Sequence, residues 1–281
     1  MTSTTATTAN LTAAILVANN NKFFTTKLKQ QIKEVAELNE DANEFVQSVI
    51  NGVHRAAVIY GQSGMGKTHV VTNTMQECGL TEGEDYAVLR SHTTPLMLYT
   101  WLYLMREKGQ FVVLDDCDGI ISKEDGLNLL KGATDNSFRQ VGWATTQQIL
   151  HPITKEVIPS SFQFNGTVII TTNVQLAVGK SRIANHLDAI RSRAASYSLN
   201  LQNKDEQFAQ IAYMVLEKDY LGNEADTAIT NDEKVELLTF LQKNIKVARR
   251  LDLRLPQIIA REMNSKKDNW ERRALRLLEA A

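Results

Sequence analysis

The stretch Gly61-Gln-Ser-Gly-Met-Gly-Lys-Thr68 decides the fold of this 281-residue chain. It matches the pattern G-x-x-x-x-G-K-[ST], whose glycines let backbone N–H groups converge on phosphate oxygens where a side chain would block the approach. An apolar strand pattern over 54–60 precedes the loop, and a helical pattern over 67–77 follows it. Strand, loop and helix in this order predict a nucleotide-phosphate site at the start of a helix.

The positions of this loop have distinct expected roles. Lys67 is expected to neutralise the β- and γ-phosphates of ATP, and the hydroxyl of Thr68 is expected to hold Mg²⁺. The whole expected phosphate-binding set is Gly61, Gln62, Ser63, Gly64, Met65, Gly66, Lys67, Thr68 and His69. The alternative is a glycine-rich turn that binds nothing, which fits the flanking strand and helix poorly.

A second apolar run, Phe111–Leu114, ends in the two carboxylates Asp115 and Asp116. A buried strand of an open α/β sheet delivers its last residues to the carboxyl edge of the sheet, where ligands bind. We therefore expect Asp115 to bind the metal through water, and Asp116 to orient or deprotonate the water that attacks the phosphate. The alternative is a turn rich in aspartate, since Asp116-Cys-Asp118-Gly119 also has turn composition.

Short apolar strands alternate with helices up to about residue 202, which predicts a parallel sheet covered on both faces. The expected strands are 54–60, 86–90, 111–114, 167–171 and 195–201, and the expected helices between them are 67–77, 95–107, 123–134 and 181–191. Four helical segments follow, at 204–218, 231–247, 253–264 and 268–280, and a mobile tail (1–20) with two helices (22–37 and 42–52) precedes the sheet. The predicted division is therefore 1–40 (tail and helix), 41–202 (α/β domain) and 203–281 (helical lid).

Three later segments resemble motifs of the AAA+ ATPase family. Thr167-Val-Ile-Ile-Thr-Thr-Asn173 is similar to the sensor 1 strand, and Ala189-Ile-Arg-Ser-Arg193-Ala resembles the arginine-finger segment of clamp-loader-like members. Asp252-Leu-Arg254-Leu resembles the sensor 2 segment that opens the third helix of the lid. The resemblance covers residues 50–280. The narrower segments 114–118, 126–132 and 159–166 are similar to AAA+ ATPases of tailed bacteriophages.

The resemblance implies a fold, an activity and an assembly. The fold would be an α/β P-loop NTPase of the AAA+ type, with a five-stranded parallel sheet and a C-terminal helical lid. The activity would be hydrolysis of Mg²⁺-ATP to ADP and phosphate, with Asn173 beside the γ-phosphate and Arg254 reaching it from the lid. Arg193 would complete the site of a neighbouring subunit in a homo-oligomeric ring or arc. A hexamer is one ring size that the resemblance allows.

Each of these assignments has a simpler structural alternative. Asn173 would then cap a loop, Arg193 would be a solvated cation at a helix end, and Arg254 would pair with a carboxylate of the lid. The chain also departs from the family pattern. It has Asp116 where the family usually has glutamate, which predicts slow or differently timed hydrolysis, and Ala194 where cysteine is common. Arg191 is the poorer second candidate for the finger.

Composition limits the partners. The formal net charge is −1, so no global basic field points to nucleic acid, and no apolar run approaches the length of a membrane span. Two distant cysteines form neither a metal spacing nor a disulfide framework, which favours a reducing cytoplasm, that of the host if the protein is phage-encoded.

A long connection over 138–165 is expected to form a β-hairpin and to have a function, because loops of this length in compact domains usually do. Its bases are Arg139 and Lys155, with His151, too few to assign nucleic-acid binding over a plain surface hairpin. Three functions remain open. The first is a motor or loader in phage DNA metabolism, of helicase or clamp-loader type, acting on DNA or on a replication protein. The others are a protein-remodelling or assembly chaperone, and an ATP-dependent oligomeric switch of low turnover.

Overall fold

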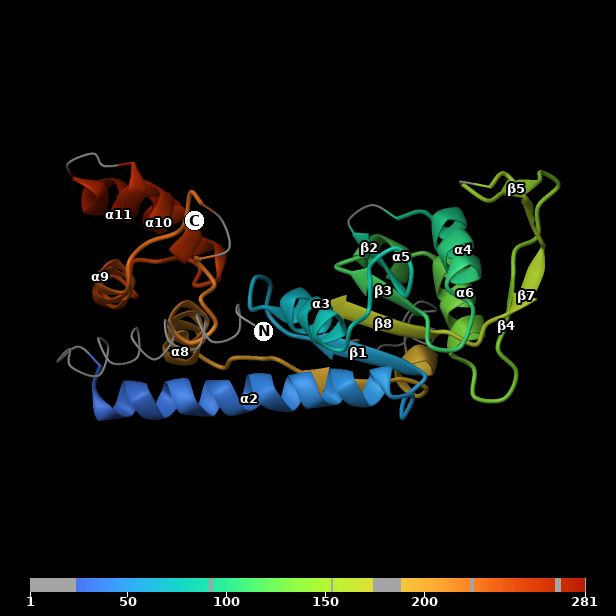
Figure 1. The fold of residues 1–281 in the computed structure, drawn as a ribbon, viewed down its shortest axis with the longest axis horizontal. Coiled ribbons are helices and arrows are strands. Elements are labelled where there is room, and N and C mark those ends of the chain that lie inside the picture. The colour runs from blue at the N-terminus through green and yellow to red at the C-terminus, as the bar shows by residue number, and fades with distance from the viewer. Residues whose placement is uncertain are drawn as a thin grey trace. The chain divides into compact units, whose positions relative to one another are not determined.

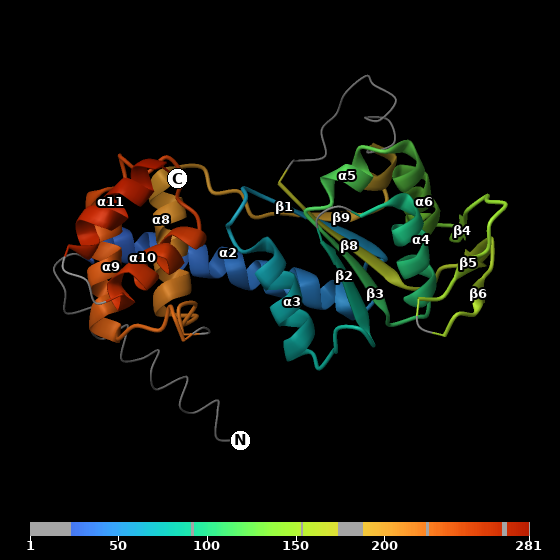
Figure 2. The same ribbon diagram turned by 90° about the horizontal axis from the view of Figure 1, so that it is seen from above.

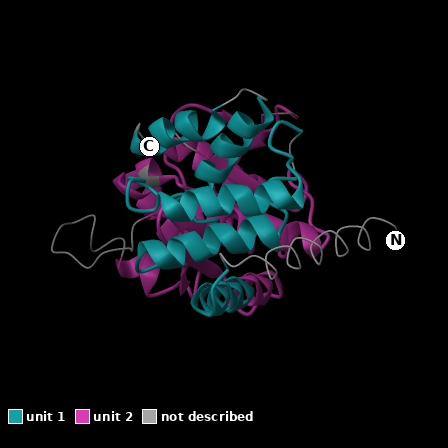
Figure 3. Cartoon of the chain, turned by 90° about the vertical axis from the view of Figure 1, so that its left-hand side faces the viewer, with its two compact units in different colours: residues 1–40, 63–66, 201–281 teal, residues 41–62, 67–200 magenta. Residues whose placement is uncertain are grey.

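The computed structural model describes residues 24–90, 93–152, 154–173, 188–222, 225–265 and 269–280 (Figure 1, Figure 2). The predicted tail over 1–20 and most of the helix predicted over 181–191 lie outside these residues. The chain divides into two compact units (Figure 3). Unit 1 comprises residues 1–40, 63–66 and 201–281, and unit 2 comprises residues 41–62 and 67–200.

Unit 2 is built on a five-stranded sheet with the strand order β2-β3-β8-β1-β9 (Figure 2). All four neighbouring pairs are parallel. The strands are β1 (Ala56–Tyr60), β2 (Tyr86–Arg90), β3 (Phe111–Asp115), β8 (Thr167–Thr172) and β9 (Ala195–Ser198). The central strands β1, β3 and β8 are nearly continuous apolar runs because both of their faces are buried. All five predicted strands are present, and the predicted α/β fold class, a five-stranded parallel sheet followed by a helical bundle, is confirmed.

The helices of unit 2 return the chain from one parallel strand to the next. They are α3 (Lys67–Glu77), α4 (Pro95–Leu104), α5 (Asp118–Ile121) and α6 (Glu124–Thr134). Helix α4 begins where expected because the hydroxyl of Thr94 accepts a hydrogen bond from the N–H of Met97, with Pro95 in the first turn. One buried cluster joins α4 and α6 to β3, through Leu98, Leu102, Leu127, Leu130, Val112 and Leu114.

The connection between α6 and β8 forms the expected β-hairpin in two paired sections. Its strands are β4 (Gln140–Gly142), β5 (Ile149–Leu150), β6 (Val157–Ile158) and β7 (Ser161–Gln163), with β4 antiparallel to β7 and β5 antiparallel to β6. At its base, Arg139 is only 8% exposed and donates hydrogen bonds to the carbonyls of Ala133 (2.7 Å) and Gly166 (2.6 Å). Burial lowers the pKa of Arg139 to about 10. Arg139, one of the few bases of this connection, is therefore buried, and its guanidinium bonds two carbonyls at the base of the hairpin.

In the part of unit 1 that the structure describes, four C-terminal helices, called the lid helices below after the prediction, accompany most of a long N-terminal helix. The lid helices are α8 (Lys204–Leu216), α9 (Asn231–Lys243), α10 (Arg254–Asn264) and α11 (Trp270–Ala280). Helix α9 starts at a capping box, in which Thr230 and Glu233 each bond the other's backbone N–H. The four helices agree with the four predicted helical segments, and the predicted and observed ends differ by at most four residues.

The prediction of two N-terminal helices over 22–37 and 42–52 is wrong, because α2 (Thr26–Ile50) is one continuous helix (Figure 1). The expected break lies between these two segments, with Asp41 as a possible cap of the second, and Asn39 lies within it. Here the Asn39 side chain is buried, and its Nδ2 donates to the carbonyl of Val35 one turn earlier, at 2.8 Å. A satisfied asparagine does not compete for the backbone, so the helix continues through it.

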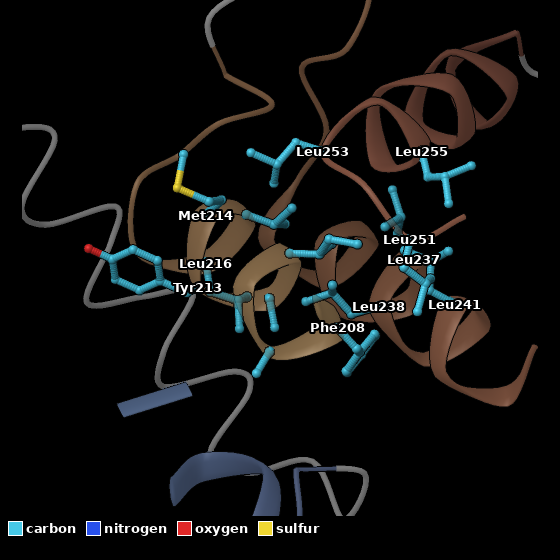
Figure 4. Packing of buried hydrophobic residues seen from close by; sticks show 14 of the residues in the cluster. Phe208, Tyr213, Met214, Leu216, Leu237, Leu238, Leu241, Leu251, Leu253 and Leu255 are labelled. Carbon is cyan, nitrogen blue, oxygen red and sulfur yellow. The ribbon is translucent and has the colours of Figure 1, made fainter. Parts of the chain in front are cut away.

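The core of unit 1 is a leucine-rich cluster between the lid helices (Figure 4). Residues on α8, α9 and the segment before α10 converge in it, among them Phe208, Leu237, Leu241, Leu251 and Leu253. Met65, from the middle of the glycine-rich loop, is 2% exposed and belongs to the same cluster. This burial places the loop segment 63–66 in unit 1 with the lid.

Candidate phosphate and metal site

In unit 2 the lysine of the loop lies at the first position of α3, directly after the turn that leaves β1. Lys67 is 4% exposed, and its Nζ donates to the carbonyls of Gly61 and Gln62, both at 3.0 Å. A third hydrogen bond, of 2.8 Å, runs from Nζ to Oδ1 of Asn173, the residue that follows β8. Strands β1 and β8 are parallel neighbours, so their carboxyl ends bring these two polar side chains together.

The threonine of the loop meets the first carboxylate of the acidic strand. Oδ1 of Asp115 accepts hydrogen bonds from the hydroxyls of Thr68 (2.5 Å) and Thr171 (2.7 Å). Thr171 lies beside Asp115 because β3 and β8 pair in that register. The Asp115 carboxylate is thereby held in one orientation at the edge of the sheet.

The oxygen donors at this point fit Mg²⁺. Magnesium prefers hard oxygen ligands, keeps several waters, and is commonly held by one or two protein oxygens together with substrate phosphates. Thr68 supplies a hydroxyl oxygen and Asp115 a carboxylate oxygen at the same place. Among the described residues, no group of three or more His, Cys, Asp or Glu side chains is placed to hold a metal ion, which excludes from this part of the chain a cage made of such side chains.

The second carboxylate, Asp116, is exposed and has a left-handed backbone with φ of 50°. Aspartate is among the few residues that visit this conformation at modest cost. The N–H of Asp116 donates to the carbonyl of Thr171 at 3.2 Å, which continues the pairing with β8, and the positive φ then turns the chain away from the sheet. Cys117 then turns inward and its thiol donates to the carbonyl of Leu89, and burial raises the pKa of that thiol.

Two residues of this edge were not predicted from the sequence. Thr171 is one, and Arg90 at the end of β2 is the other. Arg90 pairs with Asp115 in the sheet register, and its Nε lies 3.8 Å from Oδ2 of that carboxylate, while its Nη1 lies 3.3 Å from Oε1 of Glu82. Both signals are present in the sequence as polar residues that end otherwise apolar strands, but only the strand order shows that they meet Asp115.

The loop glycines have separate structural reasons. A Cβ on Gly61 would lie 2.6 Å from the carbonyl oxygen of Leu199, so the chain following β9 leaves no space for a side chain. Gly64 and Gly66 have φ of +74° and +98°, the left-handed region that favours glycine. In unit 1, a Cβ on Gly64 would also lie 2.7 Å from the Cβ of Asp252. His69 is half-buried in the first turn of α3.

The arginines singled out from the sequence lie in different surroundings. In unit 2, Nη2 of Arg193 is 3.4 Å from Oδ2 of Asp135 at the end of α6, and Arg191 is exposed. The backbone N–H groups of Phe138 and Ser137, and then Arg193, hold the pKa of Asp135 below its ordinary value.

In unit 1, Arg254 is exposed in the first turn of α10. Its backbone N–H donates to Oδ1 of Asp252 at 3.0 Å, and the other oxygen of that carboxylate pairs with Arg250 at 3.2 Å. The lid carboxylate next to Arg254 is thus occupied by the backbone of α10 and by a different guanidinium.

Comparison with known proteins gives one relative by sequence. No family model matches the chain. The relative is an uncharacterized 36.7 kDa protein of the nrdC-mobD intergenic region of Enterobacteria phage T4, 26% identical over 231 residues, or 81% of this chain and 69% of the relative. A phage relative agrees with the predicted resemblance to bacteriophage proteins.

Two solved structures are similar in outline. One is C. elegans PCH-2 (TM-score 0.39, 15% identity, 90% of this chain) and the other is Drosophila ORC bound to DNA (TM-score 0.40, 16% identity, 81% of this chain). The chain spans slightly less than two thirds of each, 66% and 62% respectively. Because both TM-scores are below 0.5, the fold assignment rests on the strand order and the loop of this chain itself. None of the helices that the structure describes is long and apolar enough to cross a membrane.

Proposed function

We propose that this protein is a Mg²⁺-dependent ATPase of the AAA+ kind that works as a homo-oligomer. One observation carries the proposal. Lys67 and Thr68 of the loop are hydrogen-bonded to Asn173 and Asp115, which come from two other strands of the sheet. In this proposal residues 41–202 are the nucleotide-binding domain and residues 203–281 are the lid.

The chemistry asks for positioning and charge rather than covalent catalysis. Lys67 neutralises the β- and γ-phosphates, and Asn173, already in contact with Lys67, contacts the γ-phosphate or the attacking water. Thr68 and Asp115 hold the metal, which neutralises phosphate charge when bound. Asp116 orients the water from the exposed turn after β3. Arg254 reads the γ-phosphate from the lid, and Arg193 stabilises the transition state in the neighbouring subunit.

The direct test is Lys67→Ala, with Lys108→Ala as a matched control because Lys108 is an exposed lysine of the same unit. We expect Lys67→Ala to keep its circular dichroism spectrum but to bind ATP at least about 100-fold more weakly, because the buried ammonium that offsets phosphate charge is removed. Lys108→Ala should bind as the wild type does. A Lys67→Ala protein that binds ATP with unchanged affinity would contradict the assignment.

The macromolecule on which such an ATPase acts is the second part of the proposal. We propose a motor or loader in phage DNA metabolism, and the relative encoded by a phage supports only the phage part of this proposal. ATP turnover should then rise when single- or double-stranded DNA is added, and the stimulation should fall steeply with salt, because phosphate contacts release counterions. Turnover stimulated by a protein partner and indifferent to DNA would favour a remodelling chaperone instead.

A specific observation favours a second candidate, an ATP-dependent switch of low turnover. Asp116 is one methylene shorter than the glutamate usual at this position. Its backbone is left-handed, a conformation that costs glutamate more than aspartate. Oligomerisation driven by ATP, with negligible phosphate release in the presence of either DNA or protein, would establish the switch.

A further inference from the structure

The tip of the phosphate loop is held by the lid through its carbonyl groups. Within unit 1, the backbone N–H of Leu253 donates to the carbonyl of Gly64 at 2.9 Å. Nε2 of Gln210, on α8, donates to the carbonyl of Met65 at 3.2 Å. Two successive carbonyls of the loop therefore end on donors supplied by two different parts of the lid.

This arrangement fixes the direction of the amides that a P-loop uses. A trans peptide is planar, so the carbonyl of one residue and the N–H of the next point in opposite directions. When the carbonyls of Gly64 and Met65 point at the donors on Leu253 and Gln210, the N–H groups of Met65 and Gly66 point away from those donors. Backbone N–H groups of this loop cradle the α- and β-phosphates in P-loop proteins.

The donor on Gln210 is itself held in place. Gln210 is 2% exposed, and its side-chain amide forms a reciprocal pair with that of Asn39 on α2, with distances of 2.7 and 3.2 Å. This pairing uses the Oε1 of Gln210 as an acceptor, which leaves Nε2 as the atom facing Met65. Gly66 of the loop also lies close to both lid residues. A Cβ on Gly66 would lie 3.5 Å from Leu253 and 3.7 Å from Nε2 of Gln210.

We propose that Gln210, together with the Asp252–Leu253 segment, is a positioning element for phosphate binding, acting on the loop amides of Met65 and Gly66 without touching the nucleotide. The inference rests on the proposed ATP-binding function. It gives α8 and the segment before α10 the role of holding the loop segment 63–66 within unit 1. The affinity for the phosphate chain then depends on a lid residue that no P-loop motif contains.

The test compares three variants for ADP, ATP and adenosine. Gln210→Leu keeps the side-chain volume but removes the donor, and Gln210→Glu keeps an acceptor for Asn39 but replaces the Nε2 donor by an oxygen. Lys234→Met is the matched control, because Lys234 is also a buried polar residue of the lid. Its side chain bonds Asp219 and Asn231 and not the phosphate loop. Calorimetry measures ADP and ATP, and NMR titration measures adenosine.

We expect both Gln210 variants to bind ADP and ATP about tenfold more weakly, because one or two hydrogen bonds from the loop amides to the charged phosphates are weakened. Their affinity for adenosine should stay within about twofold of the wild-type value. Lys234→Met should leave all three affinities unchanged. Wild-type affinity for ADP in Gln210→Leu and Gln210→Glu, or an equal loss for adenosine, would overturn the inference. A wild-type chain that binds neither ADP nor ATP would instead overturn the proposed function, and the inference with it.

Discussion

Replacing Gly64 by alanine perturbs the phosphate loop at a position that the motif leaves open. Gly64 has φ of +74°, which costs an L-residue about 1–2 kcal/mol. The new Cβ would also lie 2.7 Å from the Cβ of Asp252, and overpacking of this kind costs about 1–3 kcal/mol. The two effects together disfavour the observed loop by about 2–5 kcal/mol. Since 1.4 kcal/mol is a factor of ten, ADP should bind at least about 30-fold more weakly.

The control for this variant is Gly52→Ala. Gly52 follows α2 with φ of +79°, and no atom lies within 4 Å of a Cβ built there. The variant therefore pays the conformational cost without the clash and outside the loop. We expect Gly52→Ala to lose about 1–2 kcal/mol of unfolding free energy by denaturant titration and to keep the ADP affinity measured by calorimetry.

A second substitution separates the clash from the backbone strain. The nearest atom to the new Cβ belongs to the Cβ of Asp252, so Asp252→Gly should partly restore ADP binding to Gly64→Ala, whereas Asp252→Ala should not. Removing the Asp252 carboxylate also removes the acceptor for the N–H of Arg254, and a double-mutant cycle cancels that cost. Equal rescue by glycine and alanine at 252, or undiminished ADP binding in Gly64→Ala, would refute the reasoning.

Three further predictions concern ATP turnover and the discrimination between ATP and ADP. Asp116→Asn should keep both the left-handed backbone and ADP affinity but lower ATP turnover by about 10²–10⁴, the usual contribution of a general base, and unchanged phosphate release would assign the water to another group. Arg254→Ala should weaken ATP binding more than ADP binding in parallel calorimetric titrations, and equal losses for the two nucleotides would remove its γ-phosphate role. Arg193→Ala should bind ATP but barely hydrolyse it, while wild-type specific activity should rise with protein concentration. Mixing Arg193→Ala with Lys67→Ala should recover some activity, and no recovery together with a specific activity independent of dilution would place the whole site in one subunit.

The parts predicted correctly from the sequence are those that depend on short local patterns. Each of the five strands and four lid helices has its own hydrophobic pattern in the sequence. The glycines of the phosphate loop all lie within the eight residues 61–68. The single helix α2 was missed because a polar stretch between 37 and 42 favours a break unless its side chains have partners. Tertiary packing supplies such a partner for the amide of Asn39. The burial of Arg139 was not predicted either, because its carbonyl partners, Ala133 and Gly166, meet it only when the base of the hairpin is folded.

The contacts between elements of the candidate site were out of reach of the sequence. Arg90 and Thr171 meet Asp115 only because β2, β3 and β8 are neighbours in one register. Gly64 occupies a position where the motif accepts any residue, and its reason is the side chain of Asp252, nearly two hundred residues later. A motif lists the residues that contact the ligand. Gln210 and Asp252 instead contact the loop residues Met65 and Gly64, and no sequence pattern around them indicates this.

The contact between Arg193 and Asp135 bears on the oligomer. The resemblance to AAA+ proteins implies that the segment of Arg193 faces a neighbouring subunit, whereas the structure pairs Arg193 with a carboxylate of its own chain. The two side chains are 28% and 31% exposed, and ion pairs in contact with water contribute little because solvent screens them and ordering costs entropy. An arginine finger, by contrast, changes the rate of phosphoryl transfer by about 10³–10⁵. The charge of a transferring phosphoryl group is also greater than that of one carboxylate, so it competes well for the same guanidinium. Pairing with Asp135 is therefore a weak resting contact, and it leaves the proposed role of Arg193 in the neighbouring site intact.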